Sequence, residues 1–233
     1  MNTDYWLESW KQNKIGFHQH EINDHLSSFW KQLNAEGQSQ VFVPLCGKSL
    51  DLLWLRQQGH HVLGVEISAI AIRDFFVENK LNFNSRQQND LQIWESDHLT
   101  ILQDDFFKLT VNQLLEVVGV FDRAALVALP SSLRQKYAQH LKNILSLQAK
   151  ILLIAFEYDQ SKMEGPPFAV HEAEIHELYG DSYEIKLLLN QEALDNYPSF
   201  RSRGLNCLTE KVYLLTPNVK KLSVQCSLNA IQE

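Results

Sequence analysis

The chain has 233 residues, of which 45% are hydrophobic and 21% are charged, and its formal net charge is -7. This composition is ordinary for a globular protein and argues against a disordered chain or a coiled coil, while the length favours one domain with one substantial core. The acidic balance argues against a nucleic-acid or anionic-membrane binder, because either would need a basic face.

No segment of the sequence reads as a membrane span or a signal peptide. The longest purely apolar stretch, residues 151–156, is far shorter than the roughly 20 residues that cross a bilayer. The start of the chain lacks both the basic residues and the apolar core of a secretion signal. Three cysteines without a C-x-x-C pair are typical of a reduced protein. We therefore expect a soluble cytoplasmic protein, and nothing in the sequence demands more than a monomer.

Strand-like and helix-like segments alternate along the first half of the chain. Residues 49–58 have apolar side chains at helical spacing, and Ser68 is suited to cap the next helix. The strands expected in this half are residues 41–45, 61–67, 99–103 and 118–122, with a hairpin arm at 91–95.

The second half continues this alternation and then ends in two strands. Residues 131–147 form a clear amphipathic helix, and 151–156 are apolar throughout, as in a strand covered on both faces. A short helix at 171–179 follows a loop that contains Gly165-Pro166-Pro167. The late strands are expected at residues 183–189 and 207–216, with an irregular connection between them.

The alternation predicts an α/β fold with a doubly wound, mostly parallel twisted sheet and helices on both faces. The late pair of strands predicts an antiparallel hairpin at one edge of the sheet. Such a hairpin favours the methyltransferase version of this architecture over the dehydrogenase version. We expect residues 1–217 to form a single domain and residues 218–233 to be a loosely held C-terminal extension.

Two positions point to a ligand site at the carboxyl ends of the strands, where open α/β sheets bind their ligands. The first strand runs into Gly47, and a glycine there lets the backbone approach a ligand and turn into a helix whose amides point at it. The second strand ends at Glu66, which is placed to accept hydrogen bonds from ribose hydroxyls. Either residue alone would more often be a plain strand end or a solvated carboxylate, but the pair indicates an adenosine-containing ligand.

Two better-known nucleotide motifs fail on the same residues. Gly47-Lys48-Ser49 resembles the end of a P-loop, but Phe42 stands where the earlier glycine is required. The dinucleotide fingerprint is also incomplete, because Leu45 replaces its first glycine. A pyrophosphate needs that glycine-rich approach and a sulfonium amino acid does not. The spacing therefore favours S-adenosylmethionine, and a nicotinamide cofactor stays open on these residues alone.

Several runs of sequence together resemble the thiopurine S-methyltransferase family, and the bacterial branch fits best. The likeness covers about residues 5–217 and does not extend into residues 218–233. The runs that carry it are Trp6, Trp10 and Gly16-Phe17-His18-Gln19; Val43-Pro44-Leu45-Cys46-Gly47-Lys48-Ser49; Gly59-His60; Gly64-Val65-Glu66-Ile67-Ser68; Asp122-Arg123-Ala124-Ala125-Leu126-Val127-Ala128-Leu129; Gly165-Pro166-Pro167-Phe168; and Glu210-Lys211-Val212-Tyr213-Leu214-Leu215-Thr216.

The resemblance implies a Rossmann-like class I methyltransferase fold and transfer of a methyl group from S-adenosyl-L-methionine to the sulfur of aromatic or heterocyclic thiols, with S-adenosyl-L-homocysteine as product. An N-terminal segment, about residues 1–38, would close over the site as a lid. The residues that the resemblance assigns to the cofactor are Trp10, Leu45, Glu66, Asp105, Phe106 and Arg123. Those that it assigns to the acceptor are Phe17, Arg123 and, from a late loop that aligns ambiguously, Arg201 and Arg203.

Methyl transfer from a sulfonium needs positioning more than acid–base chemistry. The electrophile arrives activated, and holding the reactants in line while excluding water can supply roughly 7–11 kcal/mol. An aromatic thiol ionises near neutral pH, so no strong general base is required. Arg123 would be the catalytic residue, since its permanent charge could steady the thiolate or the ring atoms of the acceptor.

Each of these residues also has a plainer interpretation. Arg123 could form a structural ion pair with Asp122 or Asp105. Trp6 and Trp10 share one helix face, which usually means packing onto the core, although an aromatic ring also attracts a cationic sulfonium. Phe17 has the same ambiguity.

The histidines and Cys46 do not support other chemistry. His171 and His176 are one residue too far apart to stack on one helix face as in H-E-x-x-H, so we expect no metal site. Cys46 lies beside a helix N-terminus, where thiolates are favoured, but no histidine is placed beside it. We expect it to be a residue of the cofactor loop.

The leading hypothesis is therefore a monomeric small-molecule thiol S-methyltransferase that binds neither nucleic acid nor membrane. Selenium or tellurium compounds are further candidate acceptors. Three alternatives remain: a methyltransferase of a different small-molecule acceptor, a dehydrogenase with a degenerate fingerprint, and a non-catalytic cofactor-binding module.

Overall fold

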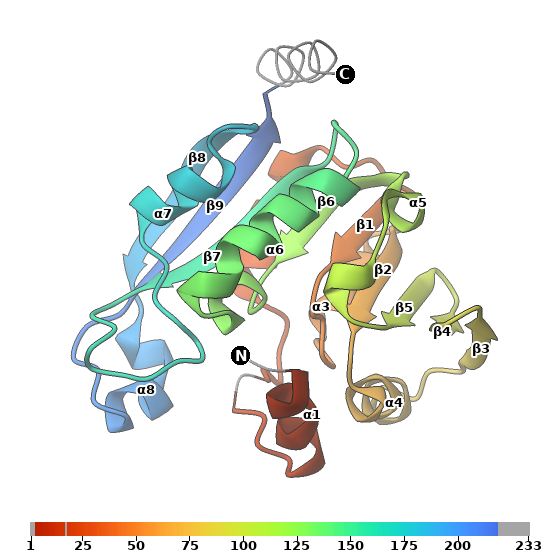
Figure 1. Ribbon diagram of the computed structural model, residues 1–233, viewed down its shortest axis with the longest axis horizontal. Helices are drawn as coiled ribbons and strands as arrows, with labels where there is room; N and C mark the ends of the chain where they lie inside the picture. The colour runs from red at the N-terminus through yellow and green to blue at the C-terminus, as the bar shows by residue number, and fades with distance from the viewer. Residues whose placement is uncertain (1–2, 17, 219–233) are drawn as a thin grey trace.

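The computed structural model describes residues 3–16 and 18–218 of the chain, and a nine-stranded sheet forms its centre (Figure 1). From one edge to the other, the strands are β3 (Asn84–Gln88), β4 (Leu91–Ser96), β5 (Leu99–Gln103), β2 (His61–Glu66), β1 (Gln40–Val43), β6 (Val117–Asp122), β7 (Lys150–Glu157), β9 (Thr209–Pro217) and β8 (Tyr183–Glu192). The five strands from β5 to β7 run parallel to one another. The strand order reverses direction on either side of β1, which makes the carboxyl end of β1 the topological switch point.

Antiparallel strands close both edges of the sheet. β8 and β9 pair with each other, and β9 pairs with β7, so the hairpin expected from the two late strands is confirmed. At the opposite edge β4 pairs with β5 as the expected hairpin arm. The mixed sheet confirms the predicted α/β fold with a parallel centre and an antiparallel edge.

Helices cover both faces of this sheet. One face is covered by α5 (Val111–Leu114), α6 (Ser131–Ile144) and α7 (Glu172–Tyr179), whose apolar side chains share a core with β6 and β7. The other face is covered by α2 (Asp24–Phe29), η1 (Trp30–Leu33), α3 (Asp51–Gln57) and α4 (Ala69–Glu78). α1 (Thr3–Lys11) lies apart from these layers, beside α4 at the carboxyl ends of the strands (Figure 1).

Local chemistry sets where several of these helices begin. The Ser68 side chain accepts a hydrogen bond from the Ala71 amide, which confirms it as the N-cap of α4. The Asn23 side chain caps α2 in the same way, by accepting from the amides of His25 and Leu26. The helix that follows this second cap was not predicted from the sequence, because its six residues are too few to show an apolar pattern at helical spacing.

The predicted element bounds differ from the observed ones mainly where backbone conformation changes abruptly. The strand expected at 41–45 ends at Val43, because Leu45 adopts a φ of 47°, in the left-handed region that no strand allows. The helix expected at 131–147 ends at Ile144, because Leu145 returns to extended backbone.

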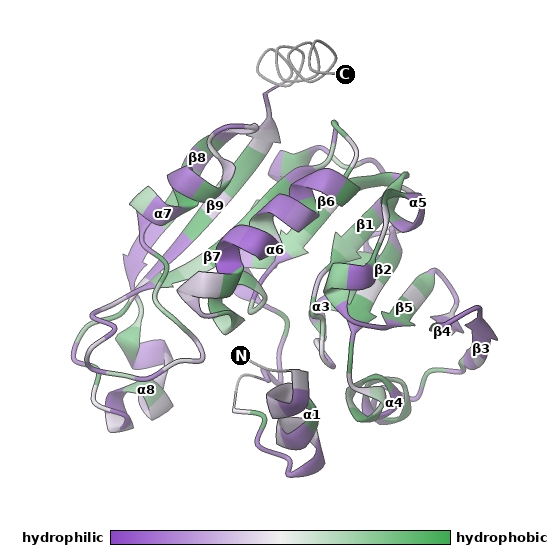
Figure 2. Cartoon of the chain, in the orientation of Figure 1, coloured by the Kyte–Doolittle hydropathy of each residue, from purple (hydrophilic) through white to green (hydrophobic). Residues whose placement is uncertain are grey.

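Two parts of the fold lie outside the sequence predictions. β3 is wholly exposed and polar, so it has no alternation to reveal it, and it stands out as hydrophilic beside the apolar central strands (Figure 2). The connection expected to be irregular between the late strands contains η4 (Leu194–Asn196) and α8 (Pro198–Ser202). These pack with the 158–169 loop into a small separate core.

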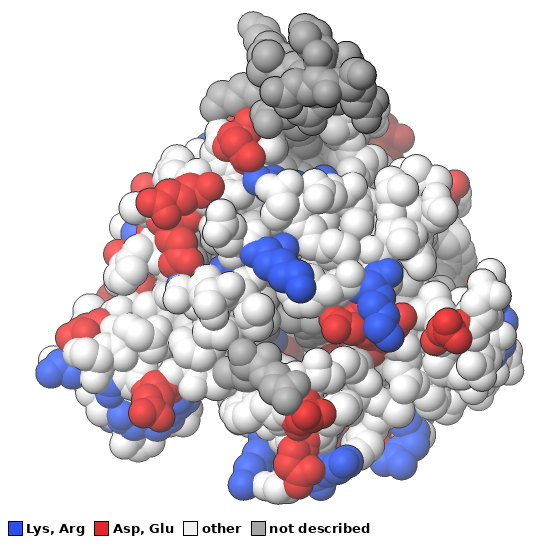
Figure 3. All heavy atoms as spheres, viewed as in Figure 1, with Lys and Arg blue, Asp and Glu red and all other residues white. Residues whose placement is uncertain are grey.

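The short helices η2 (Phe106–Lys108) and η3 (Leu126–Ala128) follow β5 and β6. Acidic and basic side chains are interspersed on the face shown in Figure 3. Within the described part of the chain, no helix has the length and apolar character that crossing a membrane would require.

Candidate active site

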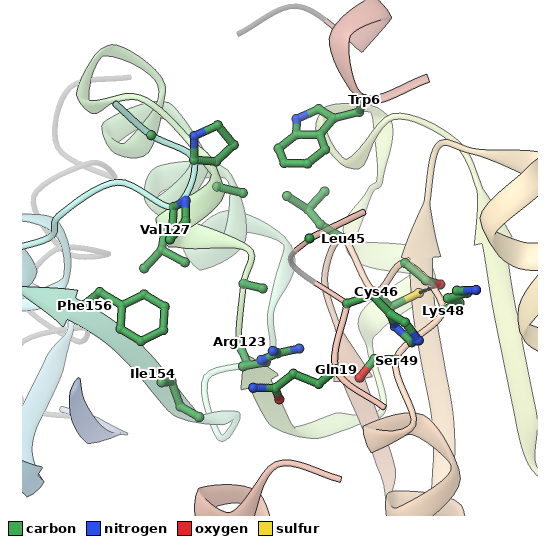
Figure 4. Close-up of a pocket in the computed structure, with 18 of the residues that line it drawn as sticks. Trp6, Gln19, Leu45, Cys46, Lys48, Ser49, Arg123, Val127, Ile154 and Phe156 are labelled. Carbon is green, nitrogen blue, oxygen red and sulfur yellow. Dashed lines mark hydrogen bonds between the residues drawn. The ribbon is translucent and has the colours of Figure 1, made fainter. Parts of the chain in front are cut away.

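The carboxyl ends of β1, β2, β6 and β7 open onto a cavity of about 610 Å³ (Figure 4). Segments far apart in the sequence line it: α1 and the residues that follow it, the turns after β1 and β6, the Gly165-Pro166-Pro167 loop, and the stretch from Asn196 to Arg203. The cavity therefore lies where the sheet topology predicts a ligand.

The turn after β1 forms one wall of the cavity through its backbone. Gly47 has a φ of 53°, and a Cβ added there would lie 3.2 Å from the Trp10 ring. Leu45 adopts a left-handed φ as well, which costs a non-glycine residue about 1–2 kcal/mol. Backbone strain of this kind persists only where the surrounding structure enforces it, and strained residues are frequent at ligand sites. Trp10, Leu45 and Gly47 all line the cavity.

Glu66, at the end of β2, brings a buried carboxylate to this wall. Its Oε2 accepts a hydrogen bond of 2.9 Å from the Gly47 amide, and its Oε1 accepts one of 2.8 Å from the Ser68 amide. Burial raises the pKa of Glu66, while these amide donors act to lower it. Each oxygen retains a lone pair, so the carboxylate can accept further hydrogen bonds from a ligand in the cavity.

Cys46 is a packing residue rather than a nucleophile. A Cβ added at Gly64 of β2 would lie 2.8 Å from the Cys46 sulfur, so glycine at this position makes room for the thiol. Burial and the neighbouring charge of Glu66 raise the pKa of the thiol well above its ordinary value. Cys46 therefore stays protonated near neutral pH.

The N-terminal segment closes one side of the cavity. Trp6 extends from α1 toward it in Figure 4, and Lys14, His18 and Gln19 line it after the helix ends. Burial, and then the charge of Lys48, lower the pKa of His18, so its imidazole is neutral near neutral pH. Phe17, which was expected to cover the acceptor, lies outside the described residues.

Arg123 reaches the cavity from the turn after β6 (Figure 4). The next residue, Ala124, has a left-handed φ of 60°, which turns the chain sharply at the end of the strand. Within residues 3–16 and 18–218, no hydrogen bond or ion pair joins the Arg123 guanidinium to another residue. Asp122 accepts instead from Leu126 and Tyr137, and Asp105 accepts from Phe107, so neither carboxylate forms the ion pair considered for Arg123.

The remaining wall is mostly apolar and aromatic. Phe156, Tyr197 and Phe200 form a cluster in which the Tyr197 and Phe200 rings stack at 5.0 Å and the Phe156 ring meets Tyr197 edge-on at 5.2 Å. This wall is completed by Val127, Ala128, Ile154, Pro166 and Pro167, with Glu210 as its buried carboxylate.

The two late-loop arginines have different positions. Arg203 lines the cavity, but its guanidinium donates hydrogen bonds to the carbonyls of Pro166 and Glu164. Arg201 is exposed and pairs with Asp195 at the surface, away from the cavity lining.

Asp105 and Phe106 are not among the residues that line the cavity. The Asp105 carboxylate caps η2, and the Phe106 ring is buried 4.7 Å from the Tyr137 ring. Their assignment to an adenine stays a prediction that this arrangement of side chains does not support.

Sequence reasoning missed several lining residues, including Ile154, Phe156, Tyr197 and Glu210. Ile154 and Phe156 could have been found, since they lie at the carboxyl end of a predicted strand of the parallel sheet. Tyr197 follows a short helix that has no sequence signal, and Glu210 was part of a family motif to which no role was assigned.

Comparison with known proteins places this chain in a family. The thiopurine S-methyltransferase family model matches residues 1–218. A thiopurine S-methyltransferase of Nitrosospira multiformis is 46% identical over 215 residues, which cover 92% of this chain and 98% of that protein. Another, from Pseudomonas fluorescens, is 42% identical over 213 residues, covering 91% of this chain and 98% of its own length.

Solved structures share the fold at low sequence identity. A methyltransferase of Anabaena variabilis that depends on S-adenosylmethionine matches with a TM-score of 0.62 and 14% identity, covering 94% of this chain and 96% of its own. The 1,6-didemethyltoxoflavin-N1-methyltransferase of Burkholderia thailandensis, solved with S-adenosylhomocysteine, matches with a TM-score of 0.60 and 13% identity, covering 91% of this chain and 86% of its own. These matches confirm the class I methyltransferase fold. The chain belongs to the thiopurine S-methyltransferase family and is an S-adenosylmethionine-dependent methyltransferase.

Proposed function

We propose that the enzyme transfers the methyl group to the sulfur of an aromatic or heterocyclic thiol. One observation carries this proposal: Arg123 lies in the same cavity as a wall of apolar and aromatic side chains. Among the described residues, Arg123 has no ion-pair partner. An aromatic ring fits such a wall, and a thiolate fits the neighbouring guanidinium.

The residues at the Glu66 end fit the cofactor. Glu66 offers buried carboxylate lone pairs for ribose hydroxyls, and the open Gly47 turn lets the backbone approach a ligand. The faces of Trp6 and Trp10 suit a cationic sulfonium. When bound, the cofactor supplies a methyl group already activated by positive charge on its sulfur.

At the other end, the protein positions the acceptor. Phe156 and Val127 would hold an aromatic ring, and Arg123 would hold its sulfur as the anion, in line for displacement. The thiol proton leaves to solvent before transfer, because an aromatic thiolate forms near neutral pH. Orientation of this kind, with water excluded, can account for roughly 7–11 kcal/mol of the barrier.

The N-terminal segment, about residues 1–38, would act as the lid that excludes water. α1 and the residues after it line the cavity without joining the sheet. Two contacts fix the far end of this segment: the Asn23 amide donates to Asp51 at 2.8 Å, and His25 contacts Glu210 at 2.9 Å. Closure would therefore move α1 relative to these anchors.

Replacement of Arg123 tests the proposed function. For Arg123→Ala we expect kcat/KM for thiophenol to fall roughly 10- to 100-fold, as expected for loss of a hydrogen bond to a charged group, with little change in affinity for S-adenosylhomocysteine. Arg86→Ala, which removes an exposed arginine of β3 paired with Glu95, is the matched control. Equal losses of cofactor affinity and turnover in Arg123→Ala would contradict the assignment to the acceptor.

An acceptor screen separates this proposal from its alternatives. Aromatic thiols, selenite and tellurite would be compared with S-adenosylmethionine as the methyl donor. Methylation of selenium or tellurium compounds in preference to every thiol would replace sulfur as the proposed acceptor. Tight binding of S-adenosylhomocysteine without turnover of any acceptor would favour a non-catalytic module.

We further propose that the enzyme acts in the cytoplasm as a monomer, with residues 1–217 as one domain and 218–233 as an extension. The exposed thiol of Cys207 fits a reducing compartment. Nothing in the sequence demands more than a monomer. Light scattering of the purified protein tests the monomer: a mass near twice 27.0 kDa would contradict it.

A further inference from the structure

Glu210, near the start of β9, is a buried carboxylate at the end of the cavity that the methyl-transfer mechanism does not use. The residue is 3% exposed and lines the cavity, and in the sheet it lies directly opposite Phe156 of β7. The next residue, Lys211, forms its ion pairs with Glu157 and Glu172. Burying an anion without pairing or hydrogen bonding is strongly unfavourable, so its partners carry information about its role.

Two side chains from distant segments hold the Glu210 carboxylate. The Tyr197 hydroxyl donates to Oε1 at 2.9 Å, and the His25 ring lies with its Nε2 at 2.9 Å from Oε2. His25 belongs to α2 and Tyr197 precedes α8, so the carboxylate links both elements to the sheet. Each oxygen has one partner and keeps a lone pair, because a carboxylate accepts about four hydrogen bonds.

Tyr197 extends the same polar surface. Burial, and then the charge of Glu210, raise the pKa of Tyr197, so the hydroxyl keeps its proton and donates a hydrogen bond to the carboxylate. Its oxygen still offers a lone pair to the cavity. The ring is fixed by stacking on Phe200 at an interplanar angle of 7°. Glu210 and Tyr197 thus give the aromatic wall hydrogen-bond acceptors.

Hydrogen-bond donors, in contrast to the acceptors of Glu210 and Tyr197, lie at the end of β6. Arg123 supplies donors and a positive charge, and Arg203, the other arginine of the lining, donates to the carbonyls of Pro166 and Glu164. The positive charge of Arg123 also acts to lower the pKa of Tyr197, which places the two groups within electrostatic reach of each other. In the sheet, β7 lies between β6, which Arg123 follows, and β9, which carries Glu210. An acceptor bound over the end of β7 would therefore have a donor at the β6 end and acceptors at the β9 end.

We propose that Glu210, held by His25 and Tyr197, is a specificity-determining residue that selects thiols whose ring carries a hydrogen-bond donor, such as a ring N–H or a hydroxyl, remote from the sulfur. This inference rests on the proposed sulfur transfer, in which Arg123 holds the thiolate. A buried polar site discriminates strongly against an analogue that leaves its groups unpaired. A ring without the donor would leave the remaining lone pairs of Glu210 and Tyr197 facing apolar carbon.

A matched series of acceptors tests this selection. Thiophenol, 4-hydroxythiophenol and 4-methoxythiophenol share one ring, and only the hydroxyl compound offers a donor. For the wild type we expect kcat/KM to be roughly 10-fold or more higher for the hydroxyl than for the methoxy compound, as for a hydrogen bond to a charged group. In Glu210→Gln we expect this ratio to fall toward one, with affinity for S-adenosylhomocysteine kept.

Two further variants control the experiment. Glu184→Gln removes the same charge from an exposed position on β8 and should leave the ratio as in the wild type. Tyr197→Phe keeps the stacked ring and removes the hydroxyl, so it should lower the ratio in the same direction. If Glu210→Gln does not fold, the ratio in Tyr197→Phe decides.

The outcomes separate the two proposals. If the wild type methylates neither these three thiols nor any other aromatic thiol, the proposed function fails. If the wild type methylates them but prefers the hydroxyl compound no more than the variants do, sulfur transfer stands and the role of Glu210 is overturned.

Discussion

Glu66 and Glu210 are buried carboxylates that line the same cavity, and they are held in different ways. Glu66 accepts from the backbone amides of Gly47 and Ser68. Glu210 is held by two side chains, of which His25 lies 185 positions away in the sequence. A carboxylate held by backbone amides needs only a strand end and a glycine turn to define it. One held by side chains depends on where distant elements pack.

This difference explains what the sequence could reveal. The Gly47 turn and Glu66 were predicted as one site because both lie at strand ends, and strand ends follow from apolar runs and glycine. Neither η4 nor α8 has more than five residues, so the position of Tyr197 left no periodic pattern to read. The cofactor end was therefore predictable from local pattern, and most of the acceptor wall was not.

The fold shows the same division. The parallel centre, the hairpin of β8 and β9 and the arm β4 beside β5 were predicted, because short apolar runs of sequence mark these strands. β3 was missed because all five of its side chains are exposed. Among the site residues taken from the family resemblance, Trp10, Leu45, Glu66, Arg123 and Arg203 line the cavity, whereas Arg201, Asp105 and Phe106 do not. Arg201 and Asp105 could not be placed in advance, because their partners Asp195 and Phe107 depend on local turns.

The largest expected effect comes from removing the backbone-held carboxylate. Glu66→Ala leaves the Gly47 and Ser68 amides without their acceptor and removes the partner of the ribose, so we expect affinity for S-adenosylhomocysteine to fall by roughly 100-fold or more. Calorimetric titration measures this directly. Glu210→Gln is the contrast, since it should change acceptor selection and spare cofactor affinity; equal losses in both would erase the distinction between the two carboxylates.

Another buried carboxylate, Asp122, sharpens the comparison because it is not among the residues that line this cavity. Burial raises its pKa from 3.8 to about 6, although the Leu126 amide and Tyr137 hydroxyl donate to it. A carboxyl whose pKa is higher in the folded state favours folding when protonated, and this contribution is lost as the pH rises through about 6. The ionised form therefore opposes folding above that pH, by up to about 3 kcal/mol.

The test of Asp122 compares urea unfolding of the wild type and Asp122→Asn between about pH 4 and about pH 8. This range begins near the ordinary pKa of 3.8 and extends above the folded-state pKa of about 6. We expect the free energy of unfolding of the wild type to rise relative to the variant as the pH falls. The variant also loses an acceptor for Tyr137, which shifts the difference by a constant. A difference that is independent of pH would refute the burial effect.

The smallest effect is expected where the backbone defines the cofactor end. Gly47→Ala introduces a left-handed alanine and a Cβ 3.2 Å from the Trp10 ring, so we expect a loss of about 1–2 kcal/mol in stability and weaker cofactor binding as Trp10 moves. Denaturant midpoints and cofactor titration measure the two consequences. Gly37→Ala, where no atom lies within 4 Å of the added Cβ, is the matched control and should change neither.

The central claim is that one cavity holds the cofactor at Glu66 and the acceptor at Arg123 and Glu210. Calorimetric titration of 4-hydroxythiophenol into enzyme saturated with S-adenosylhomocysteine tests it most directly. The two ends predict that the thiol still binds to the saturated enzyme, with an affinity equal to or higher than that for the free enzyme. Displacement of the thiol by S-adenosylhomocysteine would show that both ligands occupy one site and would contradict the division.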